Sequence, residues 1–259
     1  MVSDRVLLET ESLSKSFGGV RAVQEVSFSV RSGQIKGIIG PNGAGKTTLF
    51  NLITGVYRPD GGSIRFDSET CAGLAPNHMA ERGIARTFQN VELFERMSVL
   101  ENVMVGRHPR TRAGFISAAF RLGGARGEER LIREKALDIL GFVGIVDKAE
   151  WVSSALPFGL QRVLEIARAL ATEPRLLLLD EPASGLNAVE TRDLGRLLGR
   201  IRDRGITVLL VEHDMSLTME ICDEILVMDY GRPLAEGTPR EIQRHPQVIA
   251  AYLGEELVA

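Results

Sequence analysis

Two patterns of apolar residues along the chain predict two kinds of β-sheet. From Val26 to Arg31, apolar residues alternate with serine and arginine, so one face of this strand is buried and the other faces water, as in an antiparallel sheet. Three other runs, QIKGIIG at 34–40, RLLLLD at 175–180 and ITVLLVE at 206–212, are almost continuously apolar and lie between helical patterns. Such runs suit parallel strands that are covered on both faces. The pattern therefore predicts an α/β core with an antiparallel attachment.

Helical spacing predicts the layers around the parallel strands. A helix over 189–204 has one apolar face, which consists of Leu194, Leu197, Leu198 and Ile201. This face can pack on a sheet, so we expect the helix to be part of the scaffold. From about Ser98 to Ala155 the pattern changes to helices and loops, and it opens with Ser98 and Glu101 in the spacing of a capping box. This stretch is predicted to be an inserted helical subdomain.

Composition and charge argue against several classes of protein. The chain has 259 residues, of which 44% are hydrophobic and 25% charged, and its net charge is -3. No overall positive field would gather nucleic acid, so we expect no nucleic-acid partner. Charged residues interrupt every early apolar run, which argues against a signal peptide, and no apolar run approaches the ~20 residues of a membrane-spanning helix. Cys71 and Cys222 lack a metal-ligand spacing and are expected to be reduced thiols of a cytoplasmic protein.

One local exception to the charge balance lies at 107–126. This segment has no acidic residue and contains Arg107, Arg110, Arg112, Arg121 and Arg126. Glycine and proline are scattered among the arginines, which is typical of a solvated excursion of the chain. Contact with an anionic membrane surface or an anionic partner is the alternative interpretation.

A glycine-rich stretch, GPNGAGKTT at 40–48, follows the buried strand that ends at Ile39 and leads into a helical sequence. The order of strand, loop and helix favours a P-loop over a glycine-rich turn with a chance lysine. Its glycines let successive backbone amides and the helix N-terminus face one anion. We expect Lys46 to meet the outer phosphates of a nucleotide and Thr47 to offer its hydroxyl to Mg²⁺. The predicted nucleotide-binding residues here are Gly40, Pro41, Asn42, Gly43, Ala44, Gly45, Lys46, Thr47 and Thr48.

Acidic and histidine residues follow two of the buried strands. Asp180 ends the run RLLLLD, where a carboxylate can face the same Mg²⁺ from the ligand-binding edge of the sheet. Glu181 comes next and is placed to polarise a water for attack on the terminal phosphoryl group. His213 directly follows ITVLLVE and would emerge at the same edge, where the departing phosphate lies. A plain strand end and a structural histidine are the alternatives for these residues.

The combination resembles the ATP-binding cassette (ABC) ATPases, with GPNGAGKTT as Walker A and RLLLLDEP as Walker B. The resemblance covers nearly the whole chain. It implies an α/β fold with a P-loop NTPase core, an antiparallel β subdomain and an inserted helical subdomain, all in one ABC ATPase domain. Residues 1–90 and 160–259 would form the nucleotide-binding core with the β subdomain, and 91–159 the helical signature subdomain.

The resemblance also implies roles for three residues outside the Walker motifs. Gln89 in ARTFQN matches the glutamine loop of the family, which implies that it binds the metal, takes part in catalysis and senses the transport partner. His213 matches the switch histidine, and Phe17 in KSFGG matches the aromatic residue that stacks on adenine. By spacing alone, Phe17 would be a routine core aromatic and Gln89 a surface amide.

LPFGLQ at 156–161 occupies the position of the family's signature, usually LSGGQ, which meets ATP held by the opposite subunit of a dimer. The implied contacts are Pro157, Phe158, Gly159, Leu160 and Gln161. The stretch also starts a helix, whose N-terminus offers amide donors to a phosphate. SGLN at 184–187, which comprises Ser184, Gly185, Leu186 and Asn187, matches the dimer-contact loop but ends in asparagine where the family commonly has aspartate. Because the signature departs at three positions, we expect the two composite ATP sites to be unequal.

Less general stretches are most similar to the ATPase subunits of branched-chain amino acid importers. They are GIARTFQNVELFERMSVLENVMVGRH at 83–108, LEIARAL at 164–170, EPASGLNAVET at 181–191 and the ending from Gly231 to Glu256. In that subgroup the signature also tends to lack its serine. Within the ending, Thr238, Pro239 and Glu241 have the spacing of an N-cap, a first-turn proline and a capping-box glutamate.

This similarity implies an ATP- and Mg²⁺-dependent subunit that is peripheral on the cytoplasmic side of a bacterial inner membrane. Its implied partners are a second ABC ATPase subunit, two membrane permease subunits and, indirectly, an external solute-binding protein. Importers of amides, urea or other amino acids are alternatives. A soluble non-transport ABC ATPase is disfavoured by the single P-loop and the absence of sustained heptads. A module that binds ATP without hydrolysing it is disfavoured by Glu181 and His213.

Overall fold

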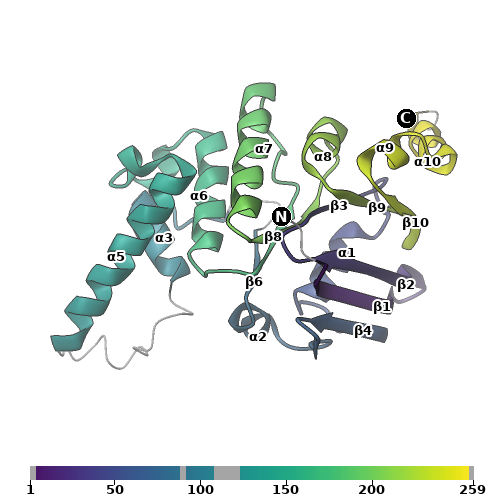
Figure 1. Cartoon of the computed structure of the whole chain (residues 1–259), viewed down its shortest axis with the longest axis horizontal. Coiled ribbons are helices and arrows are strands. Elements are labelled where there is room, and N and C mark those ends of the chain that lie inside the picture. Colours follow the sequence, from purple (N-terminus) through teal and green to yellow (C-terminus); the bar gives the residue numbers. More distant parts are fainter. Residues whose placement is uncertain (1–3, 88–91, 108–122, 257–259) are drawn as a thin grey trace.

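The computed structural model describes residues 4–87, 92–107 and 123–256, which form two sheets with helices packed around them (Figure 1). The strands are β1 (Val6–Phe17), β2 (Val20–Arg31), β3 (Ile35–Ile39), β4 (Gly61–Phe66), β5 (Glu69–Thr70), β6 (Ile84–Arg86), β7 (Leu176–Asp180), β8 (Thr207–Val211), β9 (Glu224–Asp229) and β10 (Arg232–Gly237). The helices are α1 (Lys46–Ile53), α2 (Pro76–Glu81), α3 (Val99–Gly106), α5 (Gly123–Val143), α6 (Phe158–Leu170), α7 (Ala188–Asp203), α8 (Met215–Ile221), α9 (Pro239–Gln243) and α10 (Pro246–Glu256), with the 3₁₀ turns η2 (Val146–Lys148) and η3 (Ser153–Ala155).

The larger sheet has the strand order β10-β9-β3-β8-β7-β6, in which only the edge strand β10 runs antiparallel to its neighbour. The prediction of parallel strands for the three continuous apolar runs is therefore confirmed. All five residues of β3, β7 and β8 are buried. Successive residues point to opposite faces, so Leu177 and Leu179 join one hydrophobic core while Leu176 and Leu178 join the other. The apolar runs are continuous because both faces are covered.

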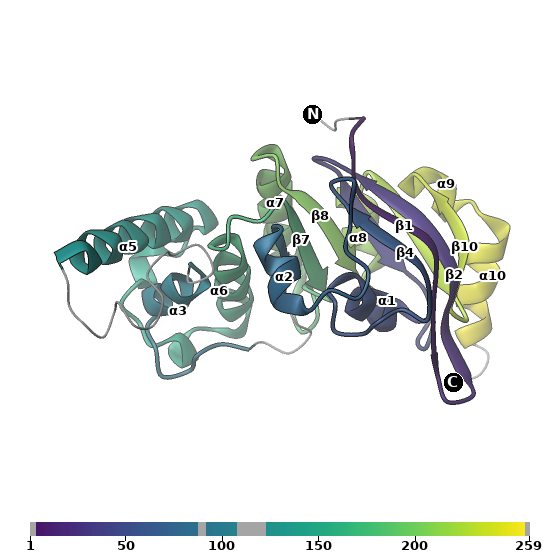
Figure 2. The same ribbon diagram turned by 90° about the horizontal axis from the view of Figure 1, so that it is seen from below.

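The smaller sheet is antiparallel and has the order β2-β1-β4-β5. Val26, Phe28 and Val30 of β2 are buried, whereas Ser27 and Arg31 are exposed, which confirms the predicted alternation. The apolar side chains of this sheet share one core with α1 and with one face of the larger sheet. Figure 2 shows β1, β2 and β4 beside α1 at the end of the molecule that also holds α9 and α10.

The opposite face of the larger sheet is covered by helices. The face of α7 that contains Leu194, Leu197, Leu198 and Ile201 is buried in the second core, so the predicted scaffold helix is confirmed. Helices α3, α5 and α6 extend this core away from the sheet (Figure 1). The predicted capping box is present at the start of α3, where Ser98 accepts a hydrogen bond from the amide of Glu101. The same motif at Thr238 and Glu241 begins α9.

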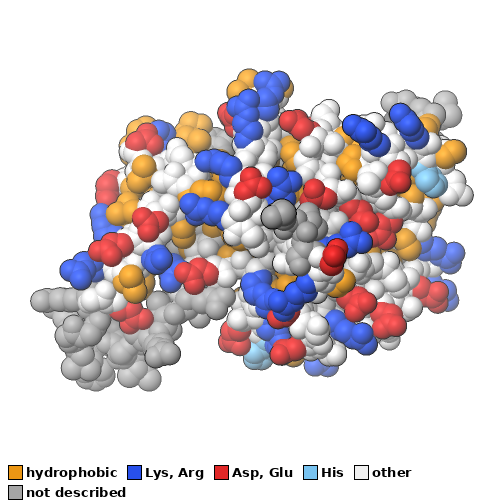
Figure 3. Space-filling model, in the orientation of Figure 1, with side chains coloured by type: hydrophobic (Ala, Val, Ile, Leu, Met, Phe, Trp, Pro, Cys, Tyr) orange, Lys and Arg blue, Asp and Glu red, His pale blue; other side chains and the backbone are white. Residues whose placement is uncertain are grey.

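Charged side chains of both signs are interspersed on the face of the molecule shown in Figure 3. Among the described helices, none combines the length and the apolar composition that crossing a bilayer requires. Most of the arginine-rich segment, residues 108–122, lies outside the described residues. Arg107 at its start forms an ion pair with Glu173, with 2.6 Å between Nη1 and Oε1.

Candidate ATP site

The P-loop connects the buried strand β3 to the first turn of α1, as the sequence predicts. Lys46 is the first residue of α1 and its side chain is buried. Its Nζ donates hydrogen bonds to the carbonyl oxygens of Gly40 at 2.6 Å and Pro41 at 2.8 Å. The ammonium group therefore lies inside the curve of the loop, where it adds a positive charge to the N-terminal end of the helix.

Two glycines of the loop are required by close backbone contacts as well as by their dihedral angles. Gly40 has a φ of 151°, and a Cβ atom there would lie 2.1 Å from the carbonyl oxygen of Met228. Gly45 has a φ of 94°, and a Cβ atom there would lie 2.2 Å from the carbonyl oxygen of Ala22. No side chain fits at either distance. The loop is thus clamped between β2 and the end of β9.

A hollow of about 590 Å³ lies over the P-loop. It is lined by residues 42–48 of the loop and α1, by the beginning of β2, and by Tyr230 in the turn between β9 and β10. Glu181 lines the same hollow. Its volume falls within the range of small-molecule sites, which is ~300–1,000 Å³. The hollow therefore brings the predicted phosphate-binding loop and the predicted catalytic carboxylate to one cavity.

Asp180 ends β7 and is almost completely buried. Its Oδ2 accepts a hydrogen bond from Nη2 of Arg86 at 2.8 Å, and Nη1 of Arg86 donates to Oδ1 of Asn51 at 2.6 Å and to Oγ1 of Thr54 at 3.1 Å. Because Asn51 and Thr54 belong to α1 or its C-cap, Arg86 ties the end of β7 to the P-loop helix. Sequence reasoning missed Arg86, although it stands in the same ARTFQN stretch as Gln89.

Glu181 and His213 lie together at the carboxyl ends of β7 and β8. Nδ1 of His213 is 3.7 Å from Oε2 of Glu181 and 3.9 Å from Oε2 of Glu212. Glu181 has a φ of 48°, in the left-handed region, and its amide donates to the carbonyl oxygen of Val211 at 2.9 Å. This contact holds the turn after β7 against the end of β8. Glu212, which sequence reasoning did not single out, is fully buried, and burial raises the pKa of its carboxyl group.

The oxygen groups of Thr47 and Asp180 are of the kind that Mg²⁺ binds. Thr47 offers a hydroxyl at the first turn of α1 and Asp180 a carboxylate at the end of β7. Across the residues described by the structure, there is no group of three or more His, Cys, Asp or Glu side chains that could hold a metal by themselves. Mg²⁺ is commonly held by one or two protein oxygens together with substrate phosphates and water, so a sparse oxygen set suits it. Gln89, the third predicted ligand, lies outside the described residues.

The predicted signature stretch begins α6 and lies against the predicted dimer-contact loop of the same chain. A Cβ atom on Gly185 would lie 2.9 Å from Cε1 of Phe158, so this ring packs directly on the loop. A Cβ atom on Gly159 would lie 2.6 Å from Oε1 of Glu190 in the first turn of α7. Pro157 and the partly exposed Phe158 face outward at the start of the helix.

Two amides in these segments make contacts within the chain. Nε2 of Gln161 donates to the carbonyl oxygen of Leu156 at 2.9 Å. The side chain of Asn187 caps α7 by accepting from the amides of Val189 and Glu190. Ser184, Leu186 and Leu160 are partly buried, and Leu160 and Leu186 pack against the same core. The loop and the signature therefore form one continuous surface.

Phe17 lies at the end of β1 and its side chain is exposed, so its reading as a routine core aromatic is wrong. Its ring packs edge to face on Tyr57, with 5.1 Å between the centroids, and Nζ of Lys15 lies 5.5 Å from the Phe17 centroid. Phe17 does not line the hollow over the P-loop; the exposed Val20 and Tyr230 do. Adenine stacking by Phe17 stays a prediction.

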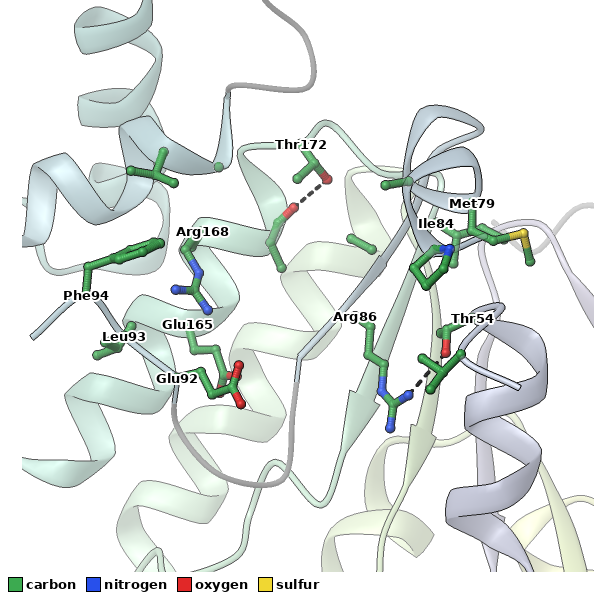
Figure 4. A pocket seen from close by; sticks show the side chains of 17 residues that line it. Thr54, Met79, Ile84, Arg86, Glu92, Leu93, Phe94, Glu165, Arg168 and Thr172 are labelled. Atoms are coloured by element: carbon green, nitrogen blue, oxygen red, sulfur yellow. Dashed lines mark hydrogen bonds between the residues drawn. The ribbon is translucent and has the colours of Figure 1, made fainter. Parts of the chain in front are cut away.

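A second hollow of about 550 Å³ opens between two groups of elements, α2 and β6 on one side and α3 and α6 on the other. Figure 4 shows Phe94 and Arg168 on one side of it and Arg86 and Thr54 on the other. Val56, Phe94 and Val105 are exposed apolar residues of its lining. The guanidinium of Arg168 lies 5.6 Å from the centroid of Phe94, and burial lowers the pKa of this arginine. We call this hollow the groove.

The fold and the glycine loop between β3 and α1 define the class of the protein, a P-loop NTPase with an antiparallel sheet and a helical region added to the core. The sequence matches the family described as "ABC transporter" over residues 23–184, and the family described as "Branched-chain amino acid ATP-binding cassette transporter" over residues 232–258.

Curated relatives and solved structures agree with these matches. The high-affinity branched-chain amino acid transport ATP-binding protein BraF of Pseudomonas aeruginosa is 47% identical and covers 97% of this chain and 99% of its own length. LivG of Salmonella typhimurium, with the same description, is 44% identical over 96% of this chain and 98% of its own length. The ADP conformation of the ABC transporter cassette MJ1267 has a TM-score of 0.84 and 31% identity, and covers 96% of this chain and 99% of that structure. A dimeric structure of the cassette MJ0796 has a TM-score of 0.76 and 25% identity, over 90% of this chain and 99% of that one. The chain belongs to the ABC transporter family, as an ATP-binding subunit with the ABC ATPase fold.

Proposed function

We propose that the chain hydrolyses ATP to energise the import of branched-chain amino acids. The observation that carries the proposal is that Glu181 lines the same hollow as the P-loop while His213 lies beside it. This arrangement supports hydrolysis over mere retention of ATP, because a carboxylate at the phosphate site can accept a proton from water. The cargo is inferred from the branched-chain amino acid transport ATP-binding proteins that this chain resembles.

In the proposed reaction the amides of residues 43–48 and the ammonium of Lys46 bind the phosphates of ATP. Mg²⁺, when held near Thr47, Asp180 and Gln89, would neutralise charge on the phosphate oxygens. Glu181 accepts a proton from the water whose oxygen bonds to the γ-phosphorus, and the bond from that phosphorus to the β–γ bridging oxygen breaks. His213 contacts the departing phosphate, and ADP and inorganic phosphate are the products. Phe17 stacks on the adenine.

The complete site requires a second ATPase subunit. In this proposal Pro157 to Gln161 meet ATP that the partner holds, and the loop from Ser184 to Asn187 contacts the partner. The exposed start of α6 supports this, because a helix N-terminus that faces outward can bind a phosphate of another subunit's nucleotide. Binding of two ATP molecules closes the pair and hydrolysis releases it, which would drive the permeases between two states.

The groove is the surface that we assign to a permease subunit. Exposed apolar residues lie on its walls. Its lining also contains Arg168, Glu165 and Glu92, and the two carboxylates are close enough to interact with the charge of Arg168. An amphipathic helix at the cytoplasmic end of a permease fits such a groove through one apolar face. Arg86 lines the groove and also donates a hydrogen bond to Asp180, so one side chain joins the groove to a predicted metal ligand. This placement supports a peripheral position on the cytoplasmic side of the inner membrane.

The proposal is tested with the complex of this chain, its partner ATPase and the two permeases in proteoliposomes. ATP is supplied on the side of the membrane that carries the ATPases, and the solute-binding protein on the other side. Under these conditions radiolabelled leucine, isoleucine and valine should be transported toward the ATPase side. Uptake of an amide or urea in place of these amino acids would reassign the cargo, and phosphate release without any transport would favour a soluble ATPase.

Lys46→Ala should abolish tight ATP binding, because it removes the ammonium that lies within the loop. The loss should be at least about a hundredfold in affinity, measured with a fluorescent ATP analogue. Lys148→Ala is the control, since Lys148 pairs with Asp147 and does not line the hollow. An unchanged dissociation constant in Lys46→Ala would remove the assignment of the phosphate site.

A further inference from the structure

Glu212 is a fully buried carboxylate at the end of an apolar strand. It directly follows β8, and its side chain has no exposed surface. Both carboxylate oxygens accept hydrogen bonds from backbone amides. Oε1 accepts from Ala183 at 2.7 Å, and Oε2 accepts from His213 at 3.1 Å and from Asp214 at 3.2 Å. All three of these partners are donors, so an ionised carboxylate suits the position.

These amides belong to two different segments. Ala183 lies between Glu181 and the dimer-contact loop that begins at Ser184. His213 and Asp214 lie at the start of α8, where the Asp214 side chain caps the helix by accepting from the amide of Leu217 at 3.0 Å. Glu212 therefore binds the turn after β7 to the turn after β8 through one side chain. Its position is fixed by both turns at once.

The two turns that Glu212 joins carry the pair of residues proposed for catalysis. Oε2 of Glu212 is 3.9 Å from Nδ1 of His213, and Oε2 of Glu181 is 3.7 Å from the same nitrogen. His213 thus stands between one buried and one partly exposed carboxylate. Its side chain is mostly exposed, so few other contacts restrain it. The hydrogen bond from its own amide to Glu212 restrains its backbone instead.

A buried charge at this position has no advantage for packing alone. Burial disfavours the ionised form, which is why the pKa of Glu212 is raised, and an apolar residue would fill the same space without that cost. An apolar residue would leave three amides without this acceptor. The carboxylate is therefore suited to fixing backbone segments rather than to filling the core.

We propose that Glu212 is a positioning residue for ATP hydrolysis, which holds the turn after Glu181 and the turn that carries His213 in one fixed arrangement. The inference rests on the proposed function, since it assumes that Glu181 and His213 act on ATP. Glu212 itself touches no substrate. Through Ala183 it also restrains the first residue of the dimer-contact loop, so loss of the carboxylate should loosen both the catalytic pair and the loop.

The test is Glu212→Gln, which keeps the size of the side chain and replaces one acceptor oxygen with an NH₂ donor. Whichever way the amide is turned, the NH₂ group faces at least one backbone N–H. The matched control is Asp223→Asn, because Oδ2 of Asp223 also accepts a backbone hydrogen bond, from Ile35 at 2.8 Å, but at the opposite end of β3 from the P-loop. Both variants are made in the complete transporter complex.

Glu212→Gln should lower kcat by about tenfold or more while the dissociation constant for ATP changes by less than about twofold, because the P-loop is untouched. Hydrogen exchange should accelerate at the amides of Ala183, His213 and Asp214 in this variant. Asp223→Asn should show neither effect. The split between turnover and affinity separates a positioning role from a general loss of structure.

Wild-type turnover in Glu212→Gln would overturn the inference and leave the proposed function standing. A parallel loss of ATP affinity and turnover, with exchange accelerated throughout the larger sheet, would also overturn it, since Glu212 would then belong to the general scaffold. Absence of phosphate release by the wild-type complex is a different result, because it removes the proposed function and with it the pair that Glu212 is proposed to position.

Discussion

The two regions proposed to contact ATP, the P-loop hollow and the signature surface, differ in what holds them in place. The P-loop is clamped by the carbonyl oxygens of Ala22 and Met228, and Lys46 is buried within it. The signature surface, which we define as 157–161 with 184–187, lies at the outside of the molecule. Phe158 packs on Gly185 within this surface, and Gly159 lies against Glu190 in the first turn of α7.

This difference indicates which region can contact ATP in the isolated chain and which needs a partner subunit. The P-loop hollow has its donors and its carboxylate within one chain, so it can bind ATP before any partner arrives. The signature surface presents the start of α6 outward, and its proposed ligand belongs to another subunit. We therefore expect changes in the hollow to affect binding by the isolated chain, and changes in the signature surface to affect only the assembled complex.

Glu181→Gln should have the largest effect on turnover. The variant removes the proposed base from the hollow, which should lower the ATPase rate at that site by about 10²–10⁴-fold while ATP binding is retained. In the assembled complex we expect a greater loss from this variant than from neutralising the equivalent glutamate of the partner ATPase. The reason is that this chain's signature lacks the serine hydroxyl, so the site it completes for the partner should turn over more slowly.

The measurement is steady-state phosphate release by complexes that carry the change in either subunit. Glu220→Gln is a suitable control in this chain, because Glu220 is an exposed residue of α8. Equal losses from the two neutralised glutamates would argue against unequal sites. The departures of LPFGLQ from the usual signature would then have no effect on the ATPase rate.

The sequence predicts the features of the molecule that depend on neighbouring residues. The P-loop is recognised because a strand, a glycine loop and a helix follow one another within 35–53. The capping box at Ser98 and Glu101 is recognised for the same reason, since its two hydrogen bonds join residues three positions apart. The period of apolar residues also separates the antiparallel strand β2 from the doubly covered strands β3, β7 and β8.

Contacts that depend on strand order could not be predicted from the sequence. Arg86 meets Asp180 only because β6 pairs with β7, and Glu212 meets Ala183 only because β7 pairs with β8. The period of two along β8 accounts for its buried apolar residues and gives no reason for a glutamate that follows them. Spacing alone also gave no reason for Phe17 to be exposed and to pack on Tyr57, which lies forty residues away in the sequence.

Gly159→Ala should disturb the signature surface to a moderate degree. The new methyl group would lie 2.6 Å from Oε1 of Glu190, so the carboxylate must move. Glu190 is the capping-box residue of α7 and accepts from the amide of Asn187 at 3.0 Å. Displacing it should cost about 1 kcal/mol of unfolding free energy, the usual value of a lost cap interaction. The ATPase rate of the complex should fall while ATP affinity of the isolated chain stays the same.

Gly141→Ala is the matched control for this variant. Gly141 is also helical, within α5, and a Cβ atom there meets nothing within 4 Å. This change should stabilise the chain by about 0.5–1 kcal/mol in denaturant unfolding, because alanine is the better helix former. Equal gains in stability for the two variants would show that Glu190 moves aside freely, and that the signature surface is less tightly packed than its contacts indicate.

Asn187→Asp should have the smallest effect on stability. Together with the reverse exchange, Asp180→Asn, it compares the two regions. Asn187 is exposed and caps α7, and aspartate is an equally good N-cap. The added charge favours a helix N-terminus but lies near Glu190, so the net change should stay within about 0.5 kcal/mol. The reverse exchange at the end of β7, Asp180→Asn, takes the carboxylate away from the nearly buried Arg86 side chain and should cost on the order of 3 kcal/mol. Similar unfolding free energies for the two variants would contradict the contrast between a clamped hollow and an exposed surface.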